Sequence, residues 1–310
     1  MLIEQAFFHL PEILVGAGYA KQEYEAGIVS AFSLALLQEL NGRNAPNPIS
    51  FLVAEKPFSK NIAMNLRADL HVRLDKLYSG SRDYSEFGFR FSNWIEAKFF
   101  RVGKGVPPST QNLGMVVADL VRLVALVPIE EAKYKKRRVT GFTVTGRYFL
   151  HGYRGDPLAH LNPNRKKGGT RAWVKPLLQP GYQELPDFDL SSETKAFFQH
   201  LGSNFKTATL ELAVTNFKIE PQAPAKKDYY TLVLSRIESA KITMGTRTFE
   251  LRQDRTFSCS PTHEFDALRA DIAAALKPKK ESEKEDGEAD AEVDEEDDVE
   301  VSDDVEVSRE

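Results

Sequence analysis

Two segments of the chain have apolar residues at every second position, and this alternation restricts the fold more than any other feature of the sequence. Side chains of a β-strand point alternately to its two faces, so residues 65–74 and 92–101 are each predicted to form a strand. One face of the first strand would carry Leu66, Ala68, Leu70, Val72 and Leu74, and one face of the second Ile95, Ala97 and Phe99. The opposite faces would carry Arg67, Asp69, His71 and Arg73 on the first strand, and Trp94, Glu96, Lys98 and Phe100 on the second.

The segments around these two strands complete an ordered set of elements. Apolar residues spaced three and four apart predict helices over residues 22–40 and 111–126. β-branched and aromatic residues predict strands over residues 49–54 and 139–151. The predicted order of elements is therefore helix, strand, strand, strand, helix, strand.

The second half of the chain has a different pattern, which indicates a β-rich second lobe over residues 153–278. Strands are predicted over 207–219, 229–243 and 246–252, and helices over 191–201 and 261–276. The last of these helices would begin with Ser260 as its N-cap and Pro261 at its first position.

Charge is distributed very unevenly along the chain. Residues 281–310 contain 17 acidic and 2 basic residues, a net charge of −15, which leaves 39 basic and 28 acidic residues in positions 1–280, a net charge of +11. Like charges and few large apolar residues predict a disordered acidic tail over residues 279–310. A basic body is typical of proteins that bind polyanions, although surplus lysine can also serve solubility alone.

The compartment and the class of protein are restricted by what the sequence lacks. Cys259 is the single cysteine, so an internal disulfide framework is excluded and a reducing cytoplasm is expected. The apolar stretch 113–127 is interrupted by Asp119 and Arg122 and is shorter than the roughly 20 residues that cross a bilayer. No basic segment precedes the apolar N-terminus, so we expect a folded N-terminus rather than a signal peptide, and no membrane partner.

The order of elements, Asp69 and the triplet Glu96-Ala97-Lys98 together resemble the PD-(D/E)XK nuclease superfamily. The resemblance covers roughly residues 20–152 and implies a restriction-endonuclease-like αβββαβ core over residues 1–152, in an α/β chain. In that family an aspartate stands on the second strand and an acidic-x-Lys triplet on the third. Here Ala68 precedes the aspartate where the family often has proline, and residues 75–91 would form an insertion.

The chemistry of phosphodiester hydrolysis explains these residue types. A divalent cation neutralises charge on the phosphate and lowers the pKa of bound water, and Mg²⁺ prefers carboxylate oxygens. Asp69 and Glu96 are the candidate ligands of Mg²⁺, or of Mn²⁺ as a substitute. Lys98, two residues along the same strand face, could orient the attacking water and stabilise the developing charge.

Further site residues follow from the resemblance. The backbone carbonyl of Ala97, the middle residue of the triplet, would complete the metal shell. A glutamate from the first helix is common in the family, and Glu25 shares the helix face of Val29 and Phe32, which is predicted to point toward the sheet. The resemblance therefore implies that Glu25 is an outer-shell or second-metal ligand. Gln111 resembles a polar helix residue that some members place beside the lysine.

Candidate DNA contacts are basic or polar residues near this centre or in basic runs. They are Arg67, His71, Arg73, Lys104, Gln111, Arg165, Lys166 and Lys167, with the run 133–138 as a further candidate. His71 fits a solvated or hydrogen-bonded neighbour better than a substrate contact. Lys104 fits a phosphate contact and the cap of a glycine turn equally well, and basic runs are often only solvated faces.

Together these features predict a Mg²⁺-dependent endonuclease of a restriction or antiviral-defence system that hydrolyses DNA. The second lobe would supply target recognition or dimer contacts, and a homodimer is expected because cleavage of both strands needs two centres. The acidic tail would compete with DNA or bind a basic partner. The alternatives are a non-catalytic nucleic-acid-binding protein with a nuclease-like fold, and a nuclease acting on RNA or branched DNA.

Overall fold

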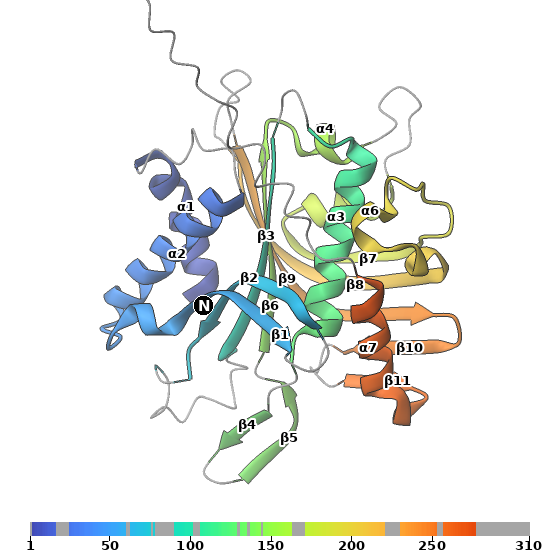
Figure 1. Cartoon of the computed structure of the whole chain (residues 1–310). Coiled ribbons are helices and arrows are strands. Elements are labelled where there is room, and N and C mark those ends of the chain that lie inside the picture. The colour runs from blue at the N-terminus through green and yellow to red at the C-terminus, as the bar shows by residue number, and fades with distance from the viewer. Residues whose placement is uncertain are drawn as a thin grey trace, which may run out of the picture. The chain divides into compact units, whose positions relative to one another are not determined.

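A single mixed β-sheet runs through the molecule, with helices on both of its faces (Figure 1). A computed structural model describes residues 2–16, 25–59, 63–75, 77, 90–101, 106–128, 131–134, 137–143, 145–162, 171–220, 230–252 and 257–276. The acidic segment 279–310 lies outside these residues. No helix in the described part of the chain combines the length and the apolar character that crossing a bilayer requires.

Nine strands form the sheet in the described residues. Their bounds are β1 Leu52–Ser59, β2 Ala63–Arg73, β3 Ser92–Phe100, β6 Thr145–Arg154, β7 Gly181–Asp189, β8 Ala208–Ile219, β9 Tyr230–Met244, β10 Arg247–Leu251 and β11 Phe257–Ser260. The order is β1-β2-β3-β6-β9-β10-β11, and β8 and β7 extend the sheet from the other edge of β9. Only β3 and β6 are parallel to each other among the pairs of described strands. A separate hairpin joins β4 Glu131–Tyr134 and β5 Arg137–Thr143.

The helices divide the interior into two cores. Their bounds are α1 Leu2–Gly16, α2 Glu25–Gly42, α3 Ser109–Val121, the π-helix η4 Arg122–Leu126, α4 Pro157–Leu161, α5 Val174–Leu178, α6 Phe198–Leu201 and α7 Phe265–Ala275, with short 3₁₀ turns η2 Pro48–Phe51, η5 Ser203–Thr207 and η7 Thr262–Glu264. Helices α1 and α2 pack against Ile95 and Leu150, and we call this the α1/α2 core. Helices α3 and α7 pack against Phe149 and Leu212 in a second core, the α3 core.

Burial of apolar side chains accounts for why α1 and α2 stay on the sheet. Phe7 of α1 and Phe32 of α2 have no exposed surface. Each fully buried side chain of this size contributes roughly 1.5–3 kcal/mol to folding. The two helices therefore anchor the N-terminal half of the chain to β2, β3 and β6, next to the candidate site.

The elements expected for the first half of the chain are present in the expected order, as α2, β1, β2, β3, α3 and β6. Three expectations were wrong. Residues 139–151 belong to two strands, β5 and β6, and the helix expected over 191–201 is only α6. Ser260 is not an N-cap, because it ends β11 in register with Thr248, and α7 begins at Phe265.

The strands predicted for the second lobe continue the sheet of the first half. Strand β9 pairs with β6 from Tyr148↔Arg236 to Arg154↔Tyr230, across the predicted boundary at residue 152. Residues 1–278 form one compact unit. The candidate site on β2 and β3 and the C-terminal strands are thus parts of one continuous sheet.

Candidate active site

Strands β2 and β3 separate from each other at Asp69 and Glu96. The two strands are in register from Arg73↔Ser92 to Leu70↔Ile95. In the described residues beyond that pair, β2 remains paired only with β1, and β3 only with β6. The fork between the strands therefore begins at Asp69 on one side and at Glu96 on the other.

The side chain of Asp69 bridges the start of this fork. Its Oδ2 accepts a hydrogen bond from the backbone N–H of Ala97 at 2.7 Å. Hydrogen bonds to an ionised acceptor are shorter and stronger than those between neutral groups. The bond holds the Asp69 side chain against the backbone of β3, at the residue between Glu96 and Lys98.

The alternation of β2 changes phase at Asp69, and this corrects the expectation from the sequence. Leu66 and Ala68 belong to the α3 core, whereas Leu70 and Val72 belong to the α1/α2 core. Residues two apart in a regular strand share a face, so the strand switches faces at position 69. The five residues from Leu66 to Leu74 therefore do not form one continuous apolar face.

Strand β1 has an irregularity at the same place. Ala54 is in register with Leu70 and Lys56 with Ala68, so Glu55 stands opposite Asp69. Glu55 has a φ of 51°, in the left-handed region that non-glycine residues seldom adopt. A left-handed residue in a strand redirects its neighbours. The sequence reasoning missed Glu55, and the segment Glu55-Lys56-Pro57 gives no clear signal of this conformation.

Lys98 is joined to the first residue of α2. Its Nζ donates a hydrogen bond to Glu25 Oε2 at 2.8 Å, and the two side chains are 8% and 16% exposed. An anionic side chain in the first turn of a helix is also favoured by the helix dipole. Glu25 therefore does point toward the sheet, where it holds the ammonium group that follows Glu96.

The three charged residues proposed for the catalytic centre are all buried. Counted over the whole residue, Asp69 is 7% exposed, Lys98 is 6% exposed and Glu96 is fully buried. Charges interact more strongly where water is excluded. A phosphate could contact Asp69 and Lys98 only after a local rearrangement, such as opening of the Lys98–Glu25 pair.

The sequence reasoning also missed His151, which is the register partner of Lys98 on β6. The His151 Nδ1 lies 2.7 Å from the Tyr153 hydroxyl, and its Nε2 lies 3.0 Å from the Ser235 hydroxyl. Burial lowers the pKa of His151 to about 3. The imidazole is therefore neutral near pH 7 and adds no positive charge beside Lys98. The available signal was the position of His151 next to the apolar run Tyr148-Phe149-Leu150 of β6.

His71 is buried instead of facing a substrate. Its ring lies 4.5 Å from the ring of Trp94, and its Nε2 is 3.0 Å from the hydroxyl of Ser92. Burial, followed by the positive charges of Lys56 and Arg73, lowers the pKa of His71 to about 4. A neutral, buried imidazole has no charge with which to bind a phosphate, so His71 is not part of the proposed site.

The described candidates among the other DNA contacts do not form one cluster, because Arg67 and Arg73 are on β2 and Gln111 is on α3. Arg67 is exposed on β2, and Arg73 pairs with Asp75 at 3.0 Å. Gln111 of α3 lies 3.0 Å from His200 of α6, so its described contact is with another helix. Lys104, Arg165, Lys166 and Lys167 lie outside the described residues, as do the side chains of the run 133–138.

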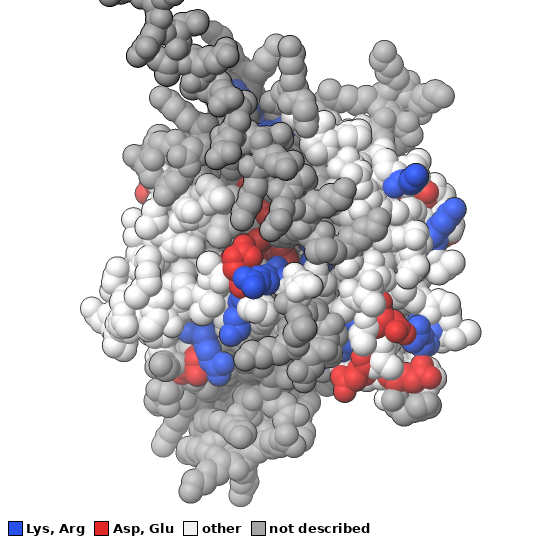
Figure 2. All heavy atoms as spheres, viewed as in Figure 1, with Lys and Arg blue, Asp and Glu red and all other residues white. Residues whose placement is uncertain are grey.

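The charged surface gives a mixed picture. Acidic and basic side chains stand side by side near the middle of the face in Figure 2, where β1, β2 and β3 meet in Figure 1. Elsewhere on this face the basic side chains of the described residues are scattered and interleaved with acidic ones. On this face the described residues therefore do not concentrate the basic charge that the sequence indicated.

The donor set at the fork suits a hard cation. No group of three or more histidine, cysteine, aspartate or glutamate side chains that could hold a metal occurs among the described residues. Mg²⁺, however, is usually bound through one or two carboxylates and keeps several waters. Asp69 and Glu96, supplemented by the Ala97 carbonyl, fit that requirement.

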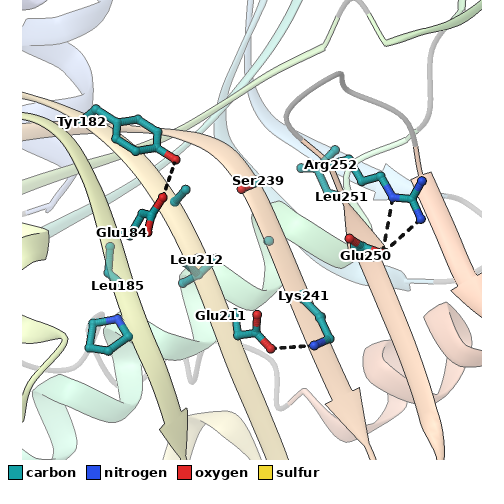
Figure 3. Close-up of a pocket in the computed structure, with 13 residues that line it drawn as sticks. Tyr182, Glu184, Leu185, Glu211, Leu212, Ser239, Lys241, Glu250, Leu251 and Arg252 are labelled. Carbon is teal, nitrogen blue, oxygen red and sulfur yellow. Dashed lines mark hydrogen bonds and ion pairs between the residues drawn. The ribbon is translucent and has the colours of Figure 1, made fainter.

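A separate groove of about 760 Å³ crosses the strands β7, β8, β9 and β10. Figure 3 shows two ion pairs in the groove, whereas Glu184 accepts a hydrogen bond from the Tyr182 hydroxyl. Lys241 contacts Glu211 at 2.6 Å, and Arg252 contacts Glu250 at 3.4 Å. Strands β3, β6 and β9 separate β8 from β2. Because the groove combines three glutamates with one lysine and one arginine, it does not suit a phosphate backbone, and it is not the candidate site.

Comparison with protein-family models, with curated proteins and with solved structures finds no match to this chain. Any function must therefore be argued from the geometry at the fork.

Proposed function

We propose that this chain is a Mg²⁺-dependent endonuclease that hydrolyses phosphodiester bonds in DNA, with Asp69, Glu96 and Lys98 at its centre. The observation that supports it most is the 2.7 Å hydrogen bond from the Ala97 backbone to Asp69 Oδ2. This contact brings an aspartate of one strand against the acidic-x-Lys triplet of the next. A lone triplet of that kind would carry little weight.

Each residue has a role that its chemistry allows. Asp69, Glu96 and the Ala97 carbonyl would hold the cation. When bound, Mg²⁺ neutralises charge on the phosphate and lowers the pKa of its water. Lys98 would donate a hydrogen bond to a phosphate oxygen and stabilise the charge that develops on it. Glu25, which contacts the Lys98 ammonium at 2.8 Å, acts as a positioning residue for the lysine.

The wider setting of the proposal comes from the sequence. The charge of +11 over residues 1–280 favours a polyanionic substrate, and a single cysteine fits the reducing cytoplasm. A restriction or antiviral-defence role is part of the proposal, with the C-terminal strands contributing recognition. A homodimer would supply the two centres needed to cut both strands of a duplex.

The test is cleavage of supercoiled plasmid DNA, with Mg²⁺ or Mn²⁺ and with a chelator. The full chain should nick or linearise the plasmid only with the metal. Asp69→Asn, Glu96→Gln and Lys98→Met should each lower the rate roughly 100-fold or more. Glu211→Gln, which removes an exposed and ion-paired carboxylate in the groove of Figure 3, should leave the rate unchanged.

Two results would contradict the proposal. Metal-dependent cleavage that persists in all three variants would come from a contaminating nuclease. Binding of DNA without cleavage under any metal condition would favour the non-catalytic alternative. Panels of RNA and branched DNA would redirect the proposal if they were cut and plasmid was not.

A further inference from the structure

Arg147 on β6 is a buried cation whose hydrogen-bonding groups are unused. The residue is 2% exposed, and it is in register with Trp94 of β3. Its Nε and Nη2 are both buried, and neither has a hydrogen-bond partner. The central carbon of this guanidinium lies over the ring of Phe257, 5.0 Å from the ring centroid.

A buried charge without a counter-charge is strongly unfavourable, and buried cations in proteins are normally paired. The neighbouring charged groups are cations, which makes a charge on Arg147 still less favourable. Burial, followed by the positive charges of Arg269 and Arg90, lowers the pKa of Arg147 to about 9. An aromatic ring below the guanidinium contacts its face and leaves the N–H groups at its edge unsatisfied.

The two unused nitrogen atoms have a specific geometry. In the planar guanidinium, Nε–H and the adjacent Nη2–H point the same way and form a fork that matches two oxygens of a carboxylate or phosphate. A third donor is near, because Thr145 lies two residues earlier on the same strand, and its hydroxyl is also buried and without a partner. Residues two apart in a strand share a face.

Arg269 of α7 approaches the same region from the helix layer. Its Nε donates to the carbonyl of Ala125 at 2.7 Å, and its Nη2 donates to Leu126 and Val127 at 3.1 and 3.3 Å. It therefore caps the end of η4, and its charge is not offset by a described carboxylate within ion-pairing distance. One anion near Arg147 would lower the repulsion between β6 and α7.

We infer that Arg147 and Thr145 form a buried site for one small inorganic oxyanion, such as phosphate or sulfate, which holds β6 and α7 together as a structural counter-ion. The burial of Arg147 excludes a phosphate that belongs to a nucleic acid strand. A water molecule could accept the hydrogen bonds but would leave the charge uncompensated. The site uses none of the residues of the proposed nuclease centre.

The test compares phosphate with chloride at matched ionic strength, with the full chain. We expect one phosphate bound per chain in equilibrium dialysis. The melting temperature should rise with the logarithm of the phosphate concentration above the Kd, by roughly 5 °C or more at a concentration about 100-fold above the Kd. Arg147→Met removes the charge at similar volume. It should abolish both phosphate binding and the rise in melting temperature, and in chloride it should be at least as stable as the native chain.

Arg171→Met is the matched control, because Arg171 is a partly exposed arginine that already pairs with Glu193. It should keep the full response to phosphate. An equal response in the native chain and in Arg147→Met would assign the effect to the general influence of phosphate on protein surfaces and overturn the inference. So would the absence of any binding by the native chain. If Arg147→Met does not fold, Thr145→Val should weaken phosphate binding about tenfold, and unchanged binding would count against the site.

Discussion

At the scale of single residues, hydrogen bonds at the fork decide which charges can act. Asp69 accepts from the Ala97 backbone, and Glu25 accepts from Lys98, so each of these carboxylates is directed by a defined donor. Two of the buried histidines, His71 and His151, lie near the fork and behave differently. His71 and His151 both have a lowered pKa, chiefly because burial penalises their charged form. At neutral pH, therefore, neither His71 nor His151 adds an imidazolium charge to the site.

The burial of His151 predicts how stability depends on pH. Its pKa is about 3 in the folded chain and 6.5 when unfolded, so below pH 6.5 the unfolded chain binds more protons. Stability should therefore fall as the pH is lowered from 6.5 toward 3, by about 1.4 kcal/mol per pH unit from this residue. Between pH 6.5 and 5, urea unfolding should show that His151→Gln loses about 2 kcal/mol less than the native chain.

The control for this measurement is His9→Gln, since the His9 side chain is 50% exposed. Its stability should follow the same pH dependence as the native chain. The comparison uses slopes, so any constant loss of stability in His151→Gln does not affect it. Parallel curves for His151→Gln and the native chain would show that His151 does not remain neutral in the fold.

At the scale of elements, local periodicity predicted α2, β2 and β3, because apolar residues recur in each at the spacing of a helix or a strand. Longer-range contacts decided the rest. Ser260-Pro261 has the composition of a helix start, yet Ser260 pairs with Thr248 across β10 and β11. The helix α1 was not predicted, although its buried residues Leu2, Ile3, Ala6, Phe7 and Leu10 have helical spacing.

The candidate site shows the same division. The sequence was sufficient to select Asp69, Glu96, Lys98 and Glu25, because strand alternation and the helix face of Glu25 are local properties. It could not predict the fork, since the separation of β2 from β3 depends on a contact between residues 69 and 97. Nor could it predict the change of phase in β2, which coincides with the left-handed conformation of Glu55 on a neighbouring strand.

The contact between α2 and β3 gives a prediction at this scale. The Lys98–Glu25 pair is mostly buried, so removal of one partner leaves the other charge uncompensated. Glu25→Ala should lower the free energy of unfolding by about 3 kcal/mol. The double variant Glu25→Ala/Lys98→Met should lose less than the sum of the two single variants, with a coupling of about 1 kcal/mol or more in urea unfolding.

A matched cycle on the exposed pair Glu211–Lys241 should give a coupling of about 0.2–1 kcal/mol, because surface ion pairs contribute little. Strict additivity of Glu25→Ala and Lys98→Met would mean that the two side chains do not interact in solution. In that case Glu25 could not position the lysine.

At the scale of the whole molecule, positive and negative charges are separated along the chain more than they are on the face shown in Figure 2. Residues 281–310 carry −15 and the preceding 280 residues carry +11. Basic side chains of the described residues are interleaved with acidic ones in Figure 2, and the groove of Figure 3 is mixed in charge. Much of the basic excess therefore belongs to segments such as 133–138 and 165–167, whose side chains lie outside the described residues.

If those segments contact DNA, the acidic residues 281–310 compete with its phosphates for them. Deletion of 281–310 should then tighten non-specific DNA binding about tenfold or more at 50 mM salt, and the difference should shrink by 200 mM because screening weakens both interactions. Fluorescence anisotropy with a short duplex measures both affinities. A variant that keeps the length but replaces the acidic residues of 281–310 by serine and glutamine should behave like the deletion. Unchanged affinity in both variants would mean that the acidic segment does not occupy the DNA-binding surface.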